Sequence, residues 1–219
     1  RIVHSKGIVI SNGTAEVLPA TYRVVSRDMV GDSIDSGYNL ALAYKPTSEI
    51  ELGLTYRSKI DLSVEGSAKL SESLTSTTYD GGTSVSVPLP SALNFAAAYT
   101  FPSKTTVEFV YERTFWSEYK ELDFNYSGTL SAVLTGVFDS TIAKNWKDVN
   151  AYRLGITQEL DELTWMCGIV IDESPIPEST LSFELPGSES VSVSFGGRYQ
   201  INEKMNVGLA ALYSMKEDR

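Results

Sequence analysis

The stretch EIELGLTYRSKIDLSVE, residues 49–65, alternates apolar and polar side chains almost without interruption. Successive side chains of a β-strand point to opposite faces, so the alternation predicts a strand with one apolar and one charged face. The apolar face would carry Ile50, Leu52, Leu54, Tyr56, Ile60, Leu62 and Val64. At about 3.3 Å per residue, such a strand is long enough to cross the hydrocarbon core of a bilayer even when it is tilted.

The same period of two recurs along most of the chain, whereas helical periodicity is nearly absent. On this basis we expect about nine strands. They would lie at residues 2–10, 36–45, 49–66, 88–101, 105–126, 148–160, 163–172, 190–201 and 205–215. The sequence therefore predicts an all-β protein.

The connections between these strands alternate between short and long. Tight turns are expected at residues 45–48, 102–104, 161–162 and 202–204, and long polar connections at about 11–35, 67–87, 127–147 and 173–189. Short turns at one end of a hairpin stack and long loops at the other are typical of outer-membrane barrels. We therefore predict an antiparallel transmembrane β-barrel.

A soluble β-sandwich binding module is the competing interpretation, because alternation alone does not show whether the apolar faces meet lipid or a second sheet. A sandwich requires Ile50, Leu52 and Leu54 to be buried against that second sheet. Two rough belts of aromatic residues favour the barrel, since such belts mark membrane–water interfaces. Tyr44, Tyr99, Phe101 and Tyr199 lie near the short turns, and Tyr38, Phe115, Trp116 and Tyr213 lie toward the long loops.

Composition limits both the partners and the chemistry. A net charge of −10 leaves no basic stripe to neutralise phosphates, so nucleic acid is not an expected partner. The mean hydropathy is −0.09, and no apolar run is long enough for a membrane-spanning helix. The single Cys167 and the single His4 make neither an internal disulfide nor a metal-ligand cluster, and we expect no cofactor.

The strand count and the chain ends indicate an incomplete barrel. Bacterial single-chain barrels normally have an even number of strands, with both termini on one side of the membrane. The chain shows no signal peptide at residue 1, and Asp218-Arg219 is not the aromatic end that such barrels usually show. We therefore expect residues 1–219 to form a single, incomplete β-barrel domain.

Several motifs in order resemble the FadL/TodX family of outer-membrane transporters for hydrophobic compounds. They run from residues 53–59 (GLTYRSK), 88–90 (PLP) and 115–119 (FWSEY) to 146–148 (WKD), 152–155 (YRLG), 168–177 (GIVIDESPIP), 183–186 (FELP) and 196–199 (GGRY). Each motif alone is weak, but their order and spacing over about residues 30–215 are specific.

The resemblance implies a 14-stranded barrel plugged by an N-terminal hatch, located in the outer membrane of a Gram-negative bacterium. Matched onto it, this chain looks like strands five to thirteen, without the hatch, the first strands and the closing strand. It implies passive transport of hydrophobic molecules, with long-chain fatty acids as the first expectation and aromatic hydrocarbons as an alternative. The expected partners are this cargo and outer-membrane lipids, and the expected state is a monomer.

The family places a lysine from this part of the barrel near the ligand head group. The resemblance points to Lys144, then to Lys147, with Arg153 facing the predicted lumen below them. A cation in a water-poor site would pair strongly with a fatty-acid carboxylate. The alternative is that Lys144 and Lys147 are solvated loop lysines, and that Arg153 pairs with Glu159 or Glu108.

The long connection at 127–147 contains apolar residues that could form a short amphipathic helix at 129–138. Leu130, Val133, Leu134 and Val137 would share one face of that helix, and Phe138 is a further apolar residue of the connection. In the family such loops form a groove that first captures cargo. Packing of the loop on itself is an equally good interpretation.

Catalysis has little support in the sequence. His4 lies in the first predicted strand with no nucleophile motif near it. Glu108 and Glu112 would lie about 13 Å apart on one strand face, which is too far for a glycosidase pair. A general porin or an adhesin remains the functional alternative within the barrel class, and we expect no enzyme.

Overall fold

The computed structural model describes residues 4–8, 24–73, 75–182 and 187–218. Its strands are β1 His4–Ile8, β2 Val24–Asp32, β3 Asn39–Tyr44, β4 Ile50–Arg57, β5 Ile60–Glu72, β6 Thr77–Leu89, β7 Ala92–Thr100, β8 Thr105–Thr114, β9 Glu121–Leu122, β10 Phe124–Tyr126, β11 Ile142–Ala143, β12 Val149–Glu159, β13 Leu163–Asp172, β14 Ser190–Asn202 and β15 Met205–Lys216. The helical elements are the 3₁₀ turns η1 Trp116–Glu118 and η2 Glu178–Thr180 and the α-helix α1 Ala132–Phe138. No helix in these ranges has the length and apolar character needed to cross a membrane.

The chain divides into two compact units. Unit 1 takes its described residues from Arg1–Ser36, Ile60–Leu89 and Glu121–Ala143, and unit 2 from Gly37–Lys59, Pro90–Lys120 and Lys144–Arg219. Unit 1 contains a five-stranded sheet in the order β1-β2-β5-β6-β10, and unit 2 contains an eight-stranded sheet. The expectation of a single barrel domain over residues 1–219 stays a prediction.

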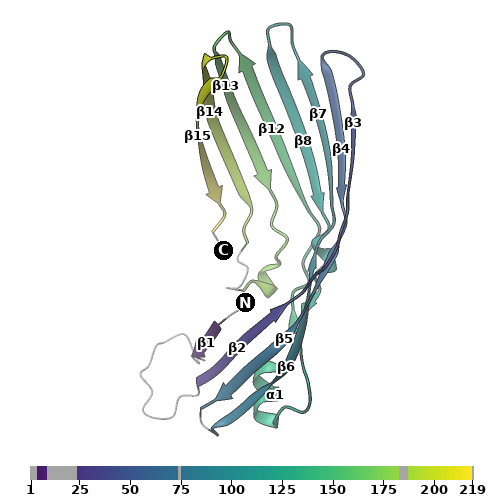
Figure 1. Ribbon diagram of the computed structural model, residues 1–219, viewed down its shortest axis with the longest axis vertical. Coiled ribbons are helices and arrows are strands. Elements are labelled where there is room, and N and C mark those ends of the chain that lie inside the picture. Colours follow the sequence, from purple (N-terminus) through teal and green to yellow (C-terminus); the bar gives the residue numbers. More distant parts are fainter. Residues whose placement is uncertain (1–3, 9–23, 74, 183–186, 219) are drawn as a thin grey trace. The chain divides into compact units, whose positions relative to one another are not determined.

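The eight-stranded sheet is a meander in which every neighbouring pair is antiparallel. Its order is β15-β14-β13-β12-β8-β7-β4-β3, and Figure 1 shows these strands side by side. Short turns join β3 to β4, β7 to β8, β12 to β13 and β14 to β15, as the sequence predicts. The segments between β4 and β7, β8 and β12, and β13 and β14 are long. The predicted sorting of short and long connections is confirmed in this sheet.

Cross-strand register gives this sheet one continuous apolar face. One register row runs Leu42, Leu54, Phe95, Tyr111, Tyr152, Ile171, Val191 and Met215 across all eight strands. Many side chains of this face are exposed, including Leu54 at 42 %, Leu154 at 44 % and Phe195 at 63 %. Ile50 and Leu52 are only partly buried. The sandwich interpretation is therefore wrong, because it requires Ile50, Leu52 and Leu54 to be buried, and Leu54 is exposed while the other two are only partly buried.

The opposite face, called the polar face below, carries small residues and charges. A row near its middle runs Glu51, Ala98, Glu108, Gly155, Gly168, Ser194 and Leu212. The next row runs Gly53, Ala96, Val110, Arg153, Val170, Ser192 and Ser214. Glycine, alanine and serine have short side chains. The few long charged side chains of this face therefore project beyond their neighbours.

The predicted single strand at 49–66 is wrong. The alternation continues through it, but β4 ends at Arg57 and β5 begins at Ile60 in the other sheet. Ser58 separates them: its backbone N–H donates to the Tyr38 carbonyl oxygen at 2.9 Å, and its hydroxyl accepts from the Tyr38 N–H at 2.9 Å. A serine at an apolar-face position was the available signal for this break.

The long polar connections predicted at 67–87 and 11–35 are also wrong in part. Residues 60–89 form the paired strands β5 and β6, and residues 24–32 form β2. These segments are rich in serine, threonine and glycine, which is typical of loops. They nevertheless alternate with period two, and Ala68 and Leu70 face a core. Of the predicted strand at 2–10, the described part is β1, which pairs with β2, and residues 2–3 and 9–10 lie outside the described residues.

The predicted strand at 105–126 is shorter than expected. β8 ends at Thr114, after which the Phe115 N–H donates to the Ser91 carbonyl oxygen at 3.0 Å and the chain enters η1. The rest of the predicted strand divides between β9, which pairs with β11, and β10, which pairs with β6. The remaining predicted strands match β3, β7 and β12 to β15 within a few residues.

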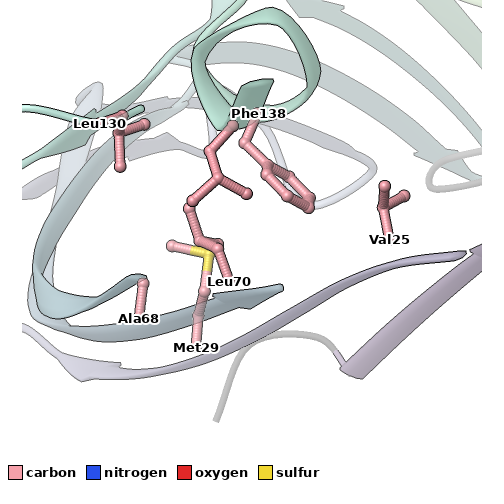
Figure 2. Packing of buried hydrophobic residues seen from close by; sticks show 7 residues of the cluster. Val25, Met29, Ala68, Leu70, Leu130 and Phe138 are labelled. Carbon is pink, nitrogen blue, oxygen red and sulfur yellow. The ribbon is translucent and has the colours of Figure 1, made fainter. Parts of the chain in front are cut away.

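Unit 1 has its own hydrophobic core. The Ser131 hydroxyl accepts a hydrogen bond from the Leu134 N–H at 3.4 Å and starts α1 at Ala132, within the predicted helix at 129–138. Figure 2 shows the core between α1 and the sheet. It contains Val25, Met29, Ala68, Leu70, Leu130, Leu134 and Phe138.

Candidate functional site

The predicted site residues fall into both units. Lys144, Lys147 and Arg153 belong to unit 2, whereas Leu130, Val133, Leu134 and Phe138 belong to unit 1. The structure therefore does not place them in one local cluster, and each group is described in its own unit.

Lys144 is buried, with 1 % of its surface exposed. Its Nζ donates to the Ser182 hydroxyl at 3.3 Å, and its carbonyl oxygen accepts from the Thr180 hydroxyl at 2.6 Å. Its backbone N–H donates to the Lys120 carbonyl oxygen at 2.7 Å. The segment around η2 thus covers Lys144 on one side, and the alternative of a solvated loop lysine is wrong for this residue.

Trp146 lies two residues further on and is also buried, at 7 % exposed. Its ring packs edge-on against Tyr119, with centroids 5.0 Å apart, and against Trp116, at 4.8 Å. The Trp146 Nε1–H has no acceptor among the described residues. A buried donor without an acceptor costs about 1–3 kcal/mol, so an incoming acceptor would be favoured here. Sequence reasoning had not selected Trp146, although its place beside two lysines was a signal.

Lys147 and Arg153 differ from Lys144. Lys147 has an exposed side chain, and its backbone N–H donates to the Pro175 carbonyl oxygen at 2.9 Å. Arg153 lies on the polar face and pairs with Glu112 at 3.4 Å and Asp172 at 4.0 Å. The expectation that Arg153 pairs with Glu159 or Glu108 is therefore wrong. Two carboxylates already surround the Arg153 guanidinium.

Two hollows open on the polar face of the eight-stranded sheet. The first, of about 340 Å³, lies over β12, β13 and β14, where Gly155, Gly168 and Gly196 leave space beside Arg153 and Glu108. The second, of about 440 Å³, lies over β4 and β7, where Gly53, Ala96 and Ala98 leave space beside Glu51 and Glu108. Both hollows are floored by side chains too short to fill them.

The apolar candidates of unit 1 are core residues. Leu134 is 1 % exposed, Phe138 is 6 % and Leu130 is 9 %, whereas Val133 is only partly buried. The Arg27 guanidinium lies 4.4 Å from the centroid of the Phe124 ring and 5.1 Å from that of Phe138. In this arrangement the connection packs on β2 and β5 rather than on itself alone, and the capture role of these residues stays a prediction.

A polar network links the end of β8 to the start of β12, where both strands meet the long connections. The Asp148 carboxylate accepts from the Ser117 N–H at 3.0 Å and from Arg113 at 3.2 Å. Burial raises the pKa of Asp148, but the hydrogen bonds from Ser117 and the charge of Arg113 outweigh it and hold the pKa below its ordinary value. Asp148 therefore stays ionised and ties η1 to the start of β12.

The second part of this network joins Asn150 to Glu173, which lies in the long connection after β13. Asn150 donates to Glu173 through its backbone N–H at 2.8 Å and its amide Nδ2 at 2.9 Å. The Asn150 Oδ1 accepts from the Tyr111 hydroxyl at 2.8 Å. Glu173 and Asp172 thus serve the loop and Arg153, and no group of three or more metal-ligating residues occurs in the ranges that the structure describes.

Comparison with known proteins gives one consistent family. Over residues 2–219 the chain matches the family described as "Outer membrane protein transport protein (OMPP1/FadL/TodX)". It is 27 % identical over 214 residues to a "47 kDa outer membrane protein" of Pasteurella multocida, covering 91 % of this chain and 48 % of that protein. It is 23 % identical over 197 residues to a "Long-chain fatty acid transport protein" of Escherichia coli, covering 84 % and 43 %. The chain thus spans about half the length of the curated relatives it matches.

Solved structures agree on the fold. A Pseudomonas aeruginosa FadL homologue superposes with a TM-score of 0.76 at 17 % identity, covering 90 % of this chain and 48 % of that one. The "CymD monoaromatic hydrocarbon channel" gives 0.64 at 20 % identity, covering 92 % and 53 %. The toluene transporter TodX of Pseudomonas putida gives 0.58 at 19 % identity, covering 87 % and 47 %. The predicted antiparallel barrel fold is thereby confirmed.

Proposed function

Because this chain belongs to the FadL/TodX family of outer-membrane transport proteins, we propose that it forms part of the wall of a channel for hydrophobic molecules. The channel would lie in the outer membrane of a Gram-negative bacterium. Transport would be passive, with cargo captured outside and moved along the barrel interior. The family consists of transport proteins, and no catalytic step is proposed.

The observation that carries this proposal is the two-faced eight-stranded sheet. Its continuous exposed apolar face suits lipid, because a barrel wall presents apolar residues to the bilayer and polar ones to its interior. Its strands of mostly 8–13 residues suit a span that needs about 9–11 residues. The polar face, with its two hollows, would then line the interior.

Long-chain fatty acids are the first candidate cargo. Lys144 and Trp146 place an ammonium group and an N–H donor in a buried region, and a carboxylate accepts from both kinds of donor. Lys147 would guide the head group, whereas Arg153 already pairs with Glu112 and Asp172 and takes no part in that step. Leu130, Val133, Leu134 and Phe138 would contribute apolar surface to capture. A relative named as a long-chain fatty acid transport protein supports this choice.

Aromatic hydrocarbons are the second candidate. The channels of the same fold named for monoaromatic hydrocarbons and toluene support it. Four glycine or alanine residues line each hollow, Gly155, Gly168, Gly196 and Ala210 in one and Ala43, Gly53, Ala96 and Ala98 in the other, and their short side chains leave room for a compact apolar molecule. A general porin or an adhesin would instead require no hydrophobic cargo.

Uptake of labelled oleate and of toluene tests the proposal in cells that lack their own transporter and carry the full-length gene. Oleate uptake that falls several-fold in Lys144→Ala, but not in the exposed turn variant Lys204→Ala, supports a fatty-acid channel with its head-group site in this chain. Toluene uptake alone keeps the channel and changes the cargo. A folded barrel that takes up neither compound contradicts the proposal and favours the porin or adhesin.

A further inference from the structure

We infer that Glu108 makes this part of the channel wall selective for uncharged hydrophobic cargo over anionic cargo of the same length. The inference rests on the proposed transport function and adds the charge class of the cargo that passes the polar face. It concerns β8 and its neighbours, and it does not involve the buried region around Lys144.

Glu108 holds a central position on the polar face. It borders both the 340 Å³ hollow and the 440 Å³ hollow, and its side chain is exposed. In its register row the neighbours are Ala98 on β7 and Gly155 on β12. Since neither neighbour has a long side chain, the Glu108 carboxylate projects above the surface around it and meets any cargo that moves between the hollows.

The nearest candidate to neutralise Glu108 is Arg153, which pairs with other residues. In the β8–β12 ladder Arg153 lies opposite Val110, so Glu108 and Glu112 are its two diagonal neighbours on β8. Its guanidinium pairs with Glu112 and with Asp172 from β13. Within the described ranges no ion pair includes Glu108.

The remaining charges near the hollows add to this effect. Glu51 lies in the same register row as Glu108, one strand beyond Ala98, and forms an ion pair with Lys45. The hollows themselves are lined by two acids, Glu51 and Glu108, and two cations, Lys45 and Arg153. Both cations are already paired, Lys45 with Glu51 and Arg153 with Glu112 and Asp172, which lie outside the two linings and bring the acids of this group to four. Acids outnumber cations, so this surface disfavours a carboxylate and tolerates an uncharged molecule.

The size of the effect follows from Coulomb's law. Two like charges about 6 Å apart, at an effective dielectric constant between that of water and that of a protein surface, change a local equilibrium by at least about threefold. Salt screens exposed charges, so the discrimination should be larger at low ionic strength. A fatty acid would pass this stretch more readily as the neutral acid than as the anion.

Initial uptake rates of labelled decanoate and decanol test the inference, because the two molecules share one alkyl chain and differ in charge at neutral pH. The full-length protein is compared with Glu108→Gln, Glu108→Lys and the turn variant Glu203→Gln, which makes the same exchange between β14 and β15 at a residue that lines neither hollow. A difference in gel mobility between heated and unheated samples confirms that each barrel is folded.

We expect Glu108→Gln to raise decanoate uptake at least about threefold, Glu108→Lys to raise it further, and decanol uptake to stay within about twofold in both. Glu203→Gln should change neither rate. Unchanged decanoate uptake in folded Glu108→Gln and Glu108→Lys would overturn the inference and leave transport intact. A wild-type protein that transports neither compound would overturn the transport proposal and the inference with it.

Discussion

Gly31 and Gly66 face each other across the β2–β5 ladder, and neither position has room for a side chain. A Cβ placed on Gly66 would lie 2.0 Å from the Val30 carbonyl oxygen, and one on Gly31 would lie 2.8 Å from the Glu65 carbonyl oxygen. Because the opposing atoms are backbone, no rotation of a side chain can relieve the overlap. The pair therefore sets how closely these two strands approach.

Gly66→Ala should destabilise unit 1 by about 3 kcal/mol or more, because the strands must separate to admit the methyl group. Hydrogen exchange of the β5 amides in the full-length protein measures this loss. Gly136→Ala is the matched control, since a Cβ there meets nothing within 4 Å and alanine favours a helix. Equal exchange rates in Gly66→Ala and wild type would contradict the close approach.

Phe95 and Ala96 are adjacent in β7 and lie on opposite faces at almost the same depth. Phe95→Arg should reduce stability by about 2–4 kcal/mol and lower the yield of folded barrel, because it places a cation in lipid. Ala96→Arg should be tolerated, because the new side chain enters the hollow beside Glu51 and Glu108. Folding yield in detergent or liposomes is the measurement. Tolerance of arginine at Phe95 would show that the apolar face does not meet lipid.

Asp148→Asn should weaken the attachment of η1 by about 1 kcal/mol at neutral pH, since it removes a charged acceptor from Ser117 and a partner from Arg113. The folded pKa of Asp148 is lowered, so its stabilisation is complete above the unfolded value near 3.8 and is lost as the pH falls through the lower folded value. The difference between variant and wild type should therefore disappear in strong acid.

Fluorescence of the Trp116–Trp146 pair during a denaturant titration at several pH values reports this attachment. Asp161→Asn, in the exposed turn between β12 and β13, is the control and should behave like wild type. A difference between Asp148→Asn and wild type that grows toward low pH would have the wrong sign and would sink this prediction.

Leu134→Ala should cost about 2–5 kcal/mol in unit 1, because it empties a site that is 1 % exposed between α1 and the sheet. Thr135→Ala, on the exposed side of the same helix, should cost far less. Hydrogen exchange of α1 and β5 is the readout. Unchanged exchange together with reduced cargo uptake would favour a capture groove over packing.

The sequence by itself determined the features that depend on neighbouring residues. The period of two placed Leu154 and Ile156 on the apolar face and Arg153 on the polar face, because alternation is a local property of a strand. The short turns, the helix near 132–138 and the resemblance of ordered motifs were readable for the same reason. The exact register between the strands was not readable from the sequence and is known only from the structure.

Tertiary structure decided which segments meet. The break at Ser58, the β5–β6 hairpin, the burial of Lys144 and the choice of Glu112 by Arg153 all depend on segments far apart in the chain. Alternation cannot reveal whether a face meets lipid, a core or a lumen, since each accepts the same pattern. Burial and pairing are set by the free energy of contacts between distant segments, and only the folded arrangement shows them.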